Sequence, residues 1–223
     1  MGLRTILGLK KHKQPTFLNE SYSQEGEDSI LSRFFDGQKR GYYVDVGALH
    51  PQRFSNTYKF YKMGWTGINI DAMPGRMDIF KKLRPLDINL EIPVSDTNEK
   101  IPFYIFNEPA LNTFSKAHAE EREQKDEYKI EKTVIIETKK LADILDEYLP
   151  QGQVIDFMTI DAEGFDYRIL TSNNWEKYRP KVVLVENELP LFEFMEADIY
   201  KLMVANKYEF MAKTIYTYFF KAT

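Results

Sequence analysis

The feature that most constrains this chain is the alternation of short β-branched or aromatic runs with segments of helical periodicity. The runs predict strands over residues 42–47, 67–71, 88–94, 155–160 and 182–185. The periodic segments predict helices over residues 55–63, 74–83 and 141–149. This order is typical of βαβ units, so we expect an α/β fold with a mostly parallel central sheet and helices on both faces. An aromatic segment over 208–221 predicts an antiparallel hairpin that closes the sheet.

The length of 223 residues and a hydrophobic fraction of 43% suffice for one packed core. We expect an N-terminal tail over residues 1–20 and a single domain over 21–223, with an insertion around 101–137. The charged stretch from Ala119 to Lys132 is typical of a solvated helix face or a mobile loop. In residues 1–13, apolar side chains precede three lysines, which fits either a tail or a basic amphipathic helix on a membrane surface.

Charge and cysteine content narrow the function. Thirty Lys and Arg against 34 Asp and Glu give a net charge of −4, which argues against a protein that grips nucleic acid through a basic face. With 0 cysteines there is no disulfide framework, thiolate metal site or cysteine nucleophile, and a reducing cytoplasm fits. No apolar run approaches the ~18–20 residues that cross a bilayer. We therefore expect a cytoplasmic protein with no transmembrane segment and no nucleic-acid partner.

Acidic side chains stand at the ends of the expected strands. Asp71, Asp161 and Glu186 each follow the last apolar residue of a strand. Asp45 lies within the first strand, just before Gly47. In an open parallel sheet, ligands bind outside the carboxyl ends of the strands, where the strand order reverses. Charged groups beside buried strands are costly unless something binds them, which favours a ligand site over a set of helix caps.

The turn after the first strand indicates what kind of ligand binds there. Gly47 allows close approach of a backbone, but no further glycines complete the Gly-x-Gly-x-x-Gly pattern of a pyrophosphate site. A nucleoside without phosphates fits better, because Asp71 can accept both ribose hydroxyls while the turn receives an amino-acid moiety. That combination describes S-adenosylmethionine.

Six short segments follow one another along most of the chain, from about Ser21 to Glu188. They are Ser23-Gln24-Glu25-Gly26-Glu27-Asp28, Tyr43-Val44-Asp45-Val46-Gly47-Ala48, Ser55-Asn56-Thr57, Gly64-Trp65-Thr66-Gly67-Ile68-Asn69-Ile70-Asp71-Ala72, Asn112-Thr113-Phe114-Ser115 and Ile160-Asp161-Ala162-Glu163-Gly164-Phe165-Asp166. In order and spacing the chain resembles the FkbM-type S-adenosylmethionine-dependent methyltransferases. The resemblance implies a Rossmann-like class I methyltransferase fold and transfer of a methyl group, commonly to a hydroxyl.

The resemblance also implies which residues hold the cofactor. Asp45, Gly47 and Ala48 would contact its methionine end, Asp71 its ribose, and Ser95 and Asp96 would lie near the adenine. The implied cofactor-binding set is Gln24, Asp28, Asp45, Gly47, Ala48, Asn56, Asp71, Ala72, Ser95, Asp96 and Asp161. Two alternatives stay open: Gln24 and Asp28 either fold over the cofactor or cap a helix, and Asn56 either contacts the cofactor or starts a helix.

An alcohol is a poor nucleophile until it loses its proton, so a general base is expected near the methyl group. Asp161 and Glu163 are the first candidates and Glu186 the next, because they stand at neighbouring strand ends. His50 is the runner-up, since its ordinary pKa of ~6.5 suits a base. As an alternative, Asp161, Glu163, Glu186 and Asn187 would supply oxygen ligands to Mg²⁺ or Ca²⁺.

The family resemblance favours a saccharide or glycan precursor as acceptor, with residues 112–132 and Leu189, Phe192 and Phe194 near its pocket. Two other functions remain open: a non-catalytic nucleotide or metabolite-binding module on the same fold, and a sugar-nucleotide oxidoreductase. A nucleic-acid methyltransferase is disfavoured by the acidic balance. A homo-oligomer is compatible with the sequence.

Overall fold

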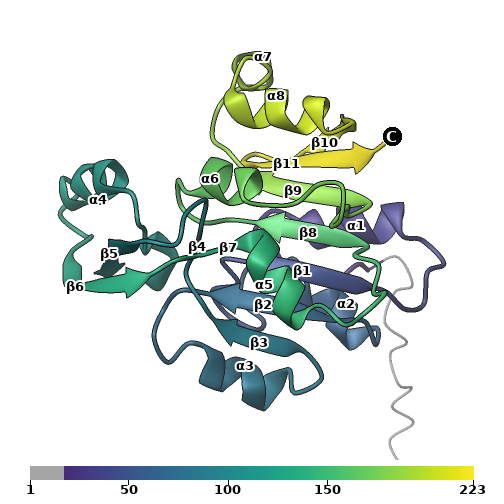
Figure 1. The fold of residues 1–223 in the computed structure, drawn as a ribbon, viewed down its shortest axis with the longest axis horizontal. Coiled ribbons are helices and arrows are strands. Elements are labelled where there is room, and N and C mark those ends of the chain that lie inside the picture. Colours follow the sequence, from purple (N-terminus) through teal and green to yellow (C-terminus); the bar gives the residue numbers. More distant parts are fainter. Residues whose placement is uncertain (1–17) are drawn as a thin grey trace, which may run out of the picture.

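The computed structural model describes residues 18–223, and its central sheet confirms the expected mostly parallel α/β fold (Figure 1). Seven strands follow the order β10-β11-β9-β8-β1-β2-β3. β11 is antiparallel to both of its neighbours, so the expected closing hairpin is confirmed, and the other pairings are parallel. The strands are β1 Tyr42–Val46, β2 Thr66–Asp71, β3 Ile88–Glu91, β8 Phe157–Ile160, β9 Val182–Glu186, β10 Tyr208–Lys213 and β11 Thr217–Ala222.

Helices cover both faces of the sheet, as expected, because alternate residues of the central strands point to opposite sides. Tyr43 packs into an aromatic cluster with Phe60 and Trp65 on one face. Val44 packs with Leu145 on the other face. The helices are α1 Glu27–Phe34, α2 Tyr58–Lys62, α3 Met77–Leu83, α5 Leu141–Tyr148, α6 Asp166–Thr171, α7 Leu191–Phe194 and α8 Asp198–Ala205. Their packing fixes the position of the strand ends that carry the acids.

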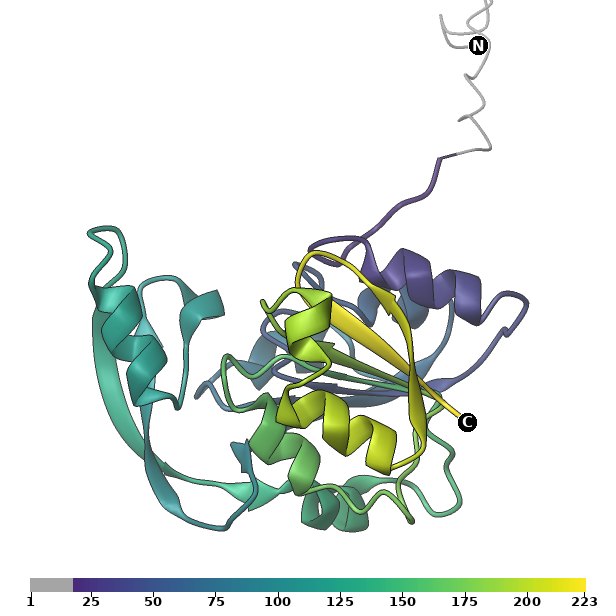
Figure 2. The same cartoon turned by 90° about the horizontal axis from the view of Figure 1, so that it is seen from above.

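The stretch after β3 leaves the sheet and forms an arm, defined here as residues 97–138, which curves away from the body in Figure 2. Its elements are β5 Lys100–Phe106, the 3₁₀ turn η2 Pro109–Leu111, α4 Lys116–Glu123 and β6 Ile130–Glu137. β5 and β6 pair antiparallel, and a short parallel pair, β4 Val94–Ser95 with β7 Lys139–Lys140, lies at the base. α4 and the turn after it expose most of their charged side chains, as the composition predicts.

The expected strand over residues 88–94 is interrupted in the structure. β3 ends at Glu91, and Val94 and Ser95 pair with a different partner, β7. Pro93 explains the break, because proline has no N–H to donate to a neighbouring strand. Its carbonyl oxygen instead accepts from the backbone N–H of Lys139 at 2.8 Å, which joins the two segments that flank the arm.

No helix among residues 18–223 is long and apolar enough to cross a membrane. The basic segment over residues 1–13, for which the sequence offers a tail or a surface helix, lies outside the described residues.

Candidate active site

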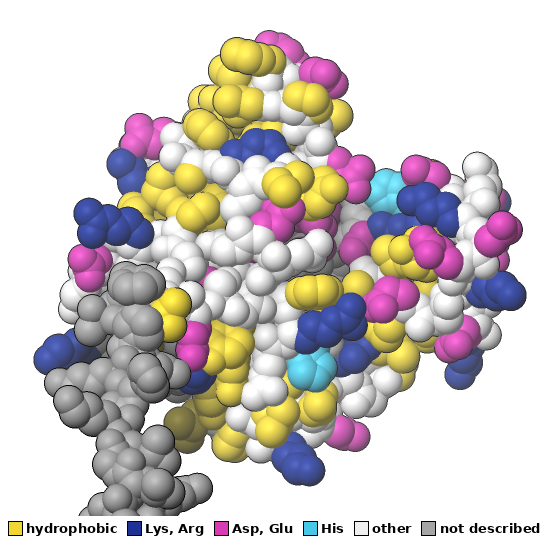
Figure 3. All heavy atoms as spheres, turned by 180° about the vertical axis from the view of Figure 1, so that it is seen from behind, with side chains coloured by type: hydrophobic (Ala, Val, Ile, Leu, Met, Phe, Trp, Pro, Cys, Tyr) yellow, Lys and Arg dark blue, Asp and Glu magenta, His cyan; other side chains and the backbone are white. Residues whose placement is uncertain are grey.

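The carboxyl ends of β1, β2, β8 and β9 meet at a cavity of about 400 Å³, a size typical of small-molecule sites. The sheet order reverses between β1 and β8, so the cavity lies at the switch point of the sheet. The arm forms one wall through Glu108–Asn112 and the rings of Phe103, Phe114 and Tyr128. In Figure 3 acidic side chains gather beside the hollow between the body and the arm.

The turn after β1 brings three strand ends together. The backbone N–H groups of Gly47 and Ala48 both donate to the carbonyl oxygen of Ile70, at 2.9 and 3.1 Å. Gly47 has a φ of 83°, and a Cβ built on it would lie 1.7 Å from the carbonyl oxygen of Asp161. Only glycine fits this position, because the conformation is left-handed and the neighbouring backbone leaves no room for a side chain.

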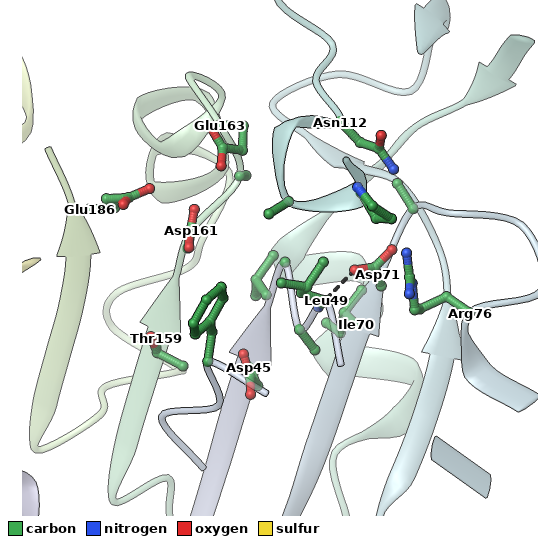
Figure 4. A pocket seen from close by; sticks show the side chains of 18 of the residues that line it. Asp45, Leu49, Ile70, Asp71, Arg76, Asn112, Thr159, Asp161, Glu163 and Glu186 are labelled. Atoms are coloured by element: carbon green, nitrogen blue, oxygen red, sulfur yellow. Dashed lines mark hydrogen bonds between the residues drawn. The ribbon is translucent and has the colours of Figure 1, made fainter. Parts of the chain in front are cut away.

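One end of the cavity is built around Asp71. Its Oδ2 accepts from the backbone N–H of Leu49 at 2.9 Å and its Oδ1 from that of Met73 at 2.7 Å. Burial raises the pKa of Asp71, while these hydrogen bonds and the charge of Arg76 act in the opposite direction. Figure 4 shows Arg76 beside Asp71, with Asn112 of the arm opposite. The Nε of Arg76 is buried and has no hydrogen-bond partner among the described residues.

The other end holds three carboxylates. Asp161, Glu163 and Glu186 each present an oxygen, and these atoms lie within 4.8 Å of one another. Burial is the main cause that raises the pKa of all three, to about 7 for Glu186, to about 8 for Glu163 and well above the ordinary value for Asp161. The charge of a neighbouring carboxylate adds to each shift. Carboxyls with pKa values near 7 are suited to accept a proton at neutral pH.

Asp45 also lines the cavity, but its side chain belongs to a buried network. Its Oδ2 accepts from Thr57 Oγ1 at 2.7 Å, and Thr57 Oγ1 in turn accepts from Arg84 Nη1 at 2.9 Å. Burial raises the pKa of Asp45 to about 6, although the hydrogen bond from Thr57 and the charge of Arg84 oppose the shift. Asp45 therefore holds the floor of the cavity in place through one oxygen.

Most of the residues that the sequence singles out lie together around this cavity. Asn56 is one of them, and its Nδ2 donates to Thr159 Oγ1 at 3.0 Å, which ties the loop after β1 to β8. The predicted residues in the lining are Gln24, Asp45, Gly47, Ala48, Asn56, Asp71, Ala72, Asp161, Glu163 and Glu186.

Two predicted residues are held by local hydrogen bonds outside the lining. The backbone N–H groups of Gln52 and Arg53 donate to His50 Nδ1, at 3.1 and 3.0 Å, so this ring nitrogen stabilises a turn. Burial lowers the pKa of His50, with the charges of Arg76 and Arg53 acting in the same direction. Asp28 is buried near the start of α1, where it accepts from the N–H of Tyr22 at 2.7 Å.

Three further predicted residues also lie outside the lining. Ser95 is buried, and its Oγ donates to Asp96 Oδ1. Asp96 forms an ion pair with Arg168 at 2.6 Å. Asn187 Oδ1 accepts from the backbone N–H of Leu189.

The structure adds residues that the sequence analysis does not single out as site residues. Thr159 and Arg76 line the cavity, and Arg122 of α4 forms an ion pair with Glu163. Arg76 and Arg122 each stand among other charged residues in the sequence. No motif or spacing there predicts that Arg76 would reach the cavity or that Arg122 would reach Glu163. Thr159 lies on β8, two positions before Asp161. Because alternate residues of a strand point to the same face, both side chains lie on one side of the sheet.

A doubly wound sheet with a cavity at its switch point defines the class of α/β proteins that hold a small ligand at the carboxyl ends of their strands. Residues 45–211 match the model of the methyltransferase FkbM domain, so the chain belongs to this methyltransferase family. A TehB-like SAM-dependent methyltransferase from Corynebacterium glutamicum ATCC 13032 Kitasato is a similar solved structure. Its TM-score is 0.45 at 9% identity, over 92% of this chain and 90% of that chain. No curated protein matches the sequence.

Proposed function

We propose that this protein is an S-adenosylmethionine-dependent O-methyltransferase that acts on a hydroxyl of a saccharide or glycan precursor. The observation that carries the proposal is the convergence of Asp161, Glu163 and Glu186 in the same cavity as Asp71. Such a reaction needs one acid that binds the ribose of the cofactor and another that accepts the proton of the acceptor hydroxyl. Membership of the methyltransferase family supports the same activity.

The cavity suits the cofactor in shape and chemistry. Asp71 would accept the ribose hydroxyls, the turn at Gly47 and Ala48 would receive the methionine end, and Ile92 and Val94 provide an apolar wall for the adenine. When bound, S-adenosylmethionine supplies an electrophilic methyl group on a positively charged sulfur. The protein then has to orient the acceptor oxygen and remove its proton.

The carboxylate cluster would remove that proton. Because its members lie close together and are half-buried, they titrate as a group, and one ionised carboxylate near neutral pH is enough to accept a proton. The hydroxyls of a sugar are hydrogen-bond donors that carboxylate oxygens can orient. The same oxygens would suit Mg²⁺ or Ca²⁺, and a bound cation would lower the pKa of the acceptor hydroxyl.

The test is transfer of labelled methyl from S-adenosylmethionine into pools of sugar nucleotides and glycan precursors, read by mass spectrometry. We expect a product heavier by one methyl group, with turnover that survives EDTA. If EDTA abolishes turnover and Mg²⁺ restores it, a bound cation activates the acceptor hydroxyl, and the free carboxylates are not the base. Cofactor binding by calorimetry without any labelled product would favour a non-catalytic module, and binding of NAD instead of S-adenosylmethionine would favour an oxidoreductase.

A further inference from the structure

The arm returns to the body at the turn that carries one of the three carboxylates. This turn, residues 161–164, follows β8 and contacts α4 of the arm and the residue Thr113 before it. Three arm side chains, Thr113, His118 and Arg122, touch it. The arm thus contributes directly to the acidic end of the cavity, although residues 139–156 separate it from β8 in the sequence.

The arm holds Glu163 at both its backbone and its side chain. Thr113 Oγ1 donates to the carbonyl oxygen of Glu163 at 2.7 Å, and His118 Nδ1 lies 3.2 Å from the same oxygen. Arg122 Nη2 donates to Glu163 Oε2, while its Nη1 donates to the carbonyl oxygen of Leu111 at 2.8 Å. The Arg122 guanidinium is therefore held by the arm through Nη1 and contacts the Glu163 carboxylate through Nη2.

The turn needs such support. Glu163 has a φ of 50°, a left-handed backbone conformation that residues other than glycine rarely adopt. Such a conformation persists only where the surrounding structure fixes it. The next residue, Gly164, lies against the imidazole of His118, where a Cβ would come within 2.4 Å of Cε1. The arm and the turn are packed so closely that a displacement of α4 would displace Glu163.

We infer that Arg122 is the positioning residue of Glu163: the arm, rather than the sheet, sets the direction of this carboxylate. The inference rests on the proposed function, in which Glu163 belongs to the proton-accepting cluster. Arg122 itself touches neither the acceptor nor the cofactor in this scheme and acts only through the carboxylate.

The charges around Glu163 favour a cation beside it. The groups that face Glu163 are Asp161 on its own turn, Glu186 at the end of β9, Asp166 at the start of α6, and His118 and Arg122 on α4. Three of them are carboxyls, and burial together with the charge of Asp161 raises the pKa of Glu163. Arg122 lowers it through its charge and its hydrogen bond. Loss of Arg122 would leave Glu163 protonated over a wider range of pH.

The experiment compares the pH dependence of kcat in the wild type, Arg122→Gln, Arg122→Lys and Lys116→Gln. Lys116 is the matched control, because it lies on the same helix in an exposed ion pair with Glu120. We expect Arg122→Gln to move the acid limb of kcat upward by about one pH unit and to lower kcat at pH 7 about tenfold. The KM for the cofactor should change less than twofold. Arg122→Lys should lie between, and Lys116→Gln should match the wild type. If Glu163→Gln loses activity while the acid limb in Arg122→Gln stays unchanged, the inference is overturned.

A second readout separates this inference from the proposed function. Titration of ¹³C-carboxyl-labelled glutamate by NMR, assigned by comparison with Glu163→Gln, follows the pKa of Glu163 without any turnover. We expect that pKa to rise in Arg122→Gln, or in Arg122→Lys by a smaller amount if the glutamine variant does not fold. A pKa that stays unchanged overturns the positioning role. A pKa that rises while Glu163→Gln retains full kcat supports the positioning role and removes Glu163 from the proposed chemistry.

Discussion

The buried Asp87 and the half-buried cluster of Asp161, Glu163 and Glu186 differ in how their carboxylate oxygens are satisfied. Asp87 accepts from Tyr43 Oη, Gly67 N–H, Asn69 Nδ2 and Arg84 Nε, all at 3.0 Å or less, so every oxygen is occupied. In the cluster, Arg122 forms an ion pair with Glu163, and Asp161 Oδ1 has no hydrogen-bond partner among the described residues.

The difference separates a structural acid from a functional one. A buried charge with a full set of donors stabilises one conformation and has nothing left to offer a ligand. A buried charge with free acceptor capacity costs free energy until a proton, a cation or a ligand meets it. The Asp87 network therefore holds β1, β2 and α3 together, while the cluster at β8 and β9 is available for chemistry. Each prediction below acts on one side of this comparison.

The largest expected effect is a loss of stability at Asp87, whose oxygens all accept hydrogen bonds. Arg84→Met removes the cation that Asp87 and Thr57 both contact, in a position where the side chains of Arg84 and Asp87 are fully buried. Breaking a buried ion pair by removing one partner costs about 3–5 kcal/mol. Urea denaturation should show that loss in the free energy of unfolding. Arg33→Met, in an exposed pair with Asp36, is the control and should leave it unchanged. Equal stability of Arg84→Met and the wild type would contradict the structural role.

The next largest effect is a loss of catalytic rate at the carboxylate cluster, which has free acceptor capacity. Asp161→Asn keeps the shape of the side chain but removes its capacity to accept a proton, so we expect kcat to fall by about 10²–10⁴-fold. The dissociation constant of S-adenosylmethionine should change far less. Single-turnover methyl transfer and calorimetry measure the two quantities, with Asp36→Asn as a surface control. A variant that loses cofactor affinity as strongly as turnover would assign Asp161 to binding instead.

The position of these acids was predictable because a parallel sheet brings the carboxyl ends of its strands to one edge. Asp71, Asp161 and Glu186 could therefore be grouped from the sequence alone. Their partners could not. Arg122 reaches Glu163 from an arm whose curvature depends on the pairing of β5 with β6, and no local pattern encodes that path.

His50 shows the opposite limit of sequence reasoning. An imidazole next to the ligand turn has the right chemistry for a base, but the chain reverses so tightly after Ala48 that the ring nitrogen meets the N–H groups of Gln52 and Arg53. Residue type predicts what a side chain can do, whereas the backbone that follows it decides which partner it finds.

A smaller effect is expected at Asp71, where the acid is partly occupied. Like Asp87, it accepts a hydrogen bond at each oxygen, but it also faces the cavity beside Arg76. Asp71→Asn should weaken binding of S-adenosylmethionine by roughly 10–100-fold, because hydrogen bonds to charged groups contribute about 1.5–3 kcal/mol. The kcat at saturating cofactor should stay within a few-fold. Calorimetry measures the affinity, with Asp78→Asn on the exposed face of α3 as a control. Unchanged affinity would move the ribose site away from β2.

The smallest effect is a gain in stability on the free side. The pKa of Glu163 in the folded protein is about 8, against an ordinary value of 4.5, so the folded state binds this proton more tightly than the unfolded chain. The stability that this carboxyl contributes is fully present below about pH 4.5 and is lost as the pH rises through about 8. Glu163→Gln cannot ionise, so its advantage over the wild type should grow between pH 5 and pH 8, to about 0.5–2 kcal/mol. Thermal unfolding across that range measures it. If the wild type were instead the more stable protein at pH 8, the ionised Glu163 would be as well satisfied as Asp87, and the contrast between the two groups of acids would fail at this residue.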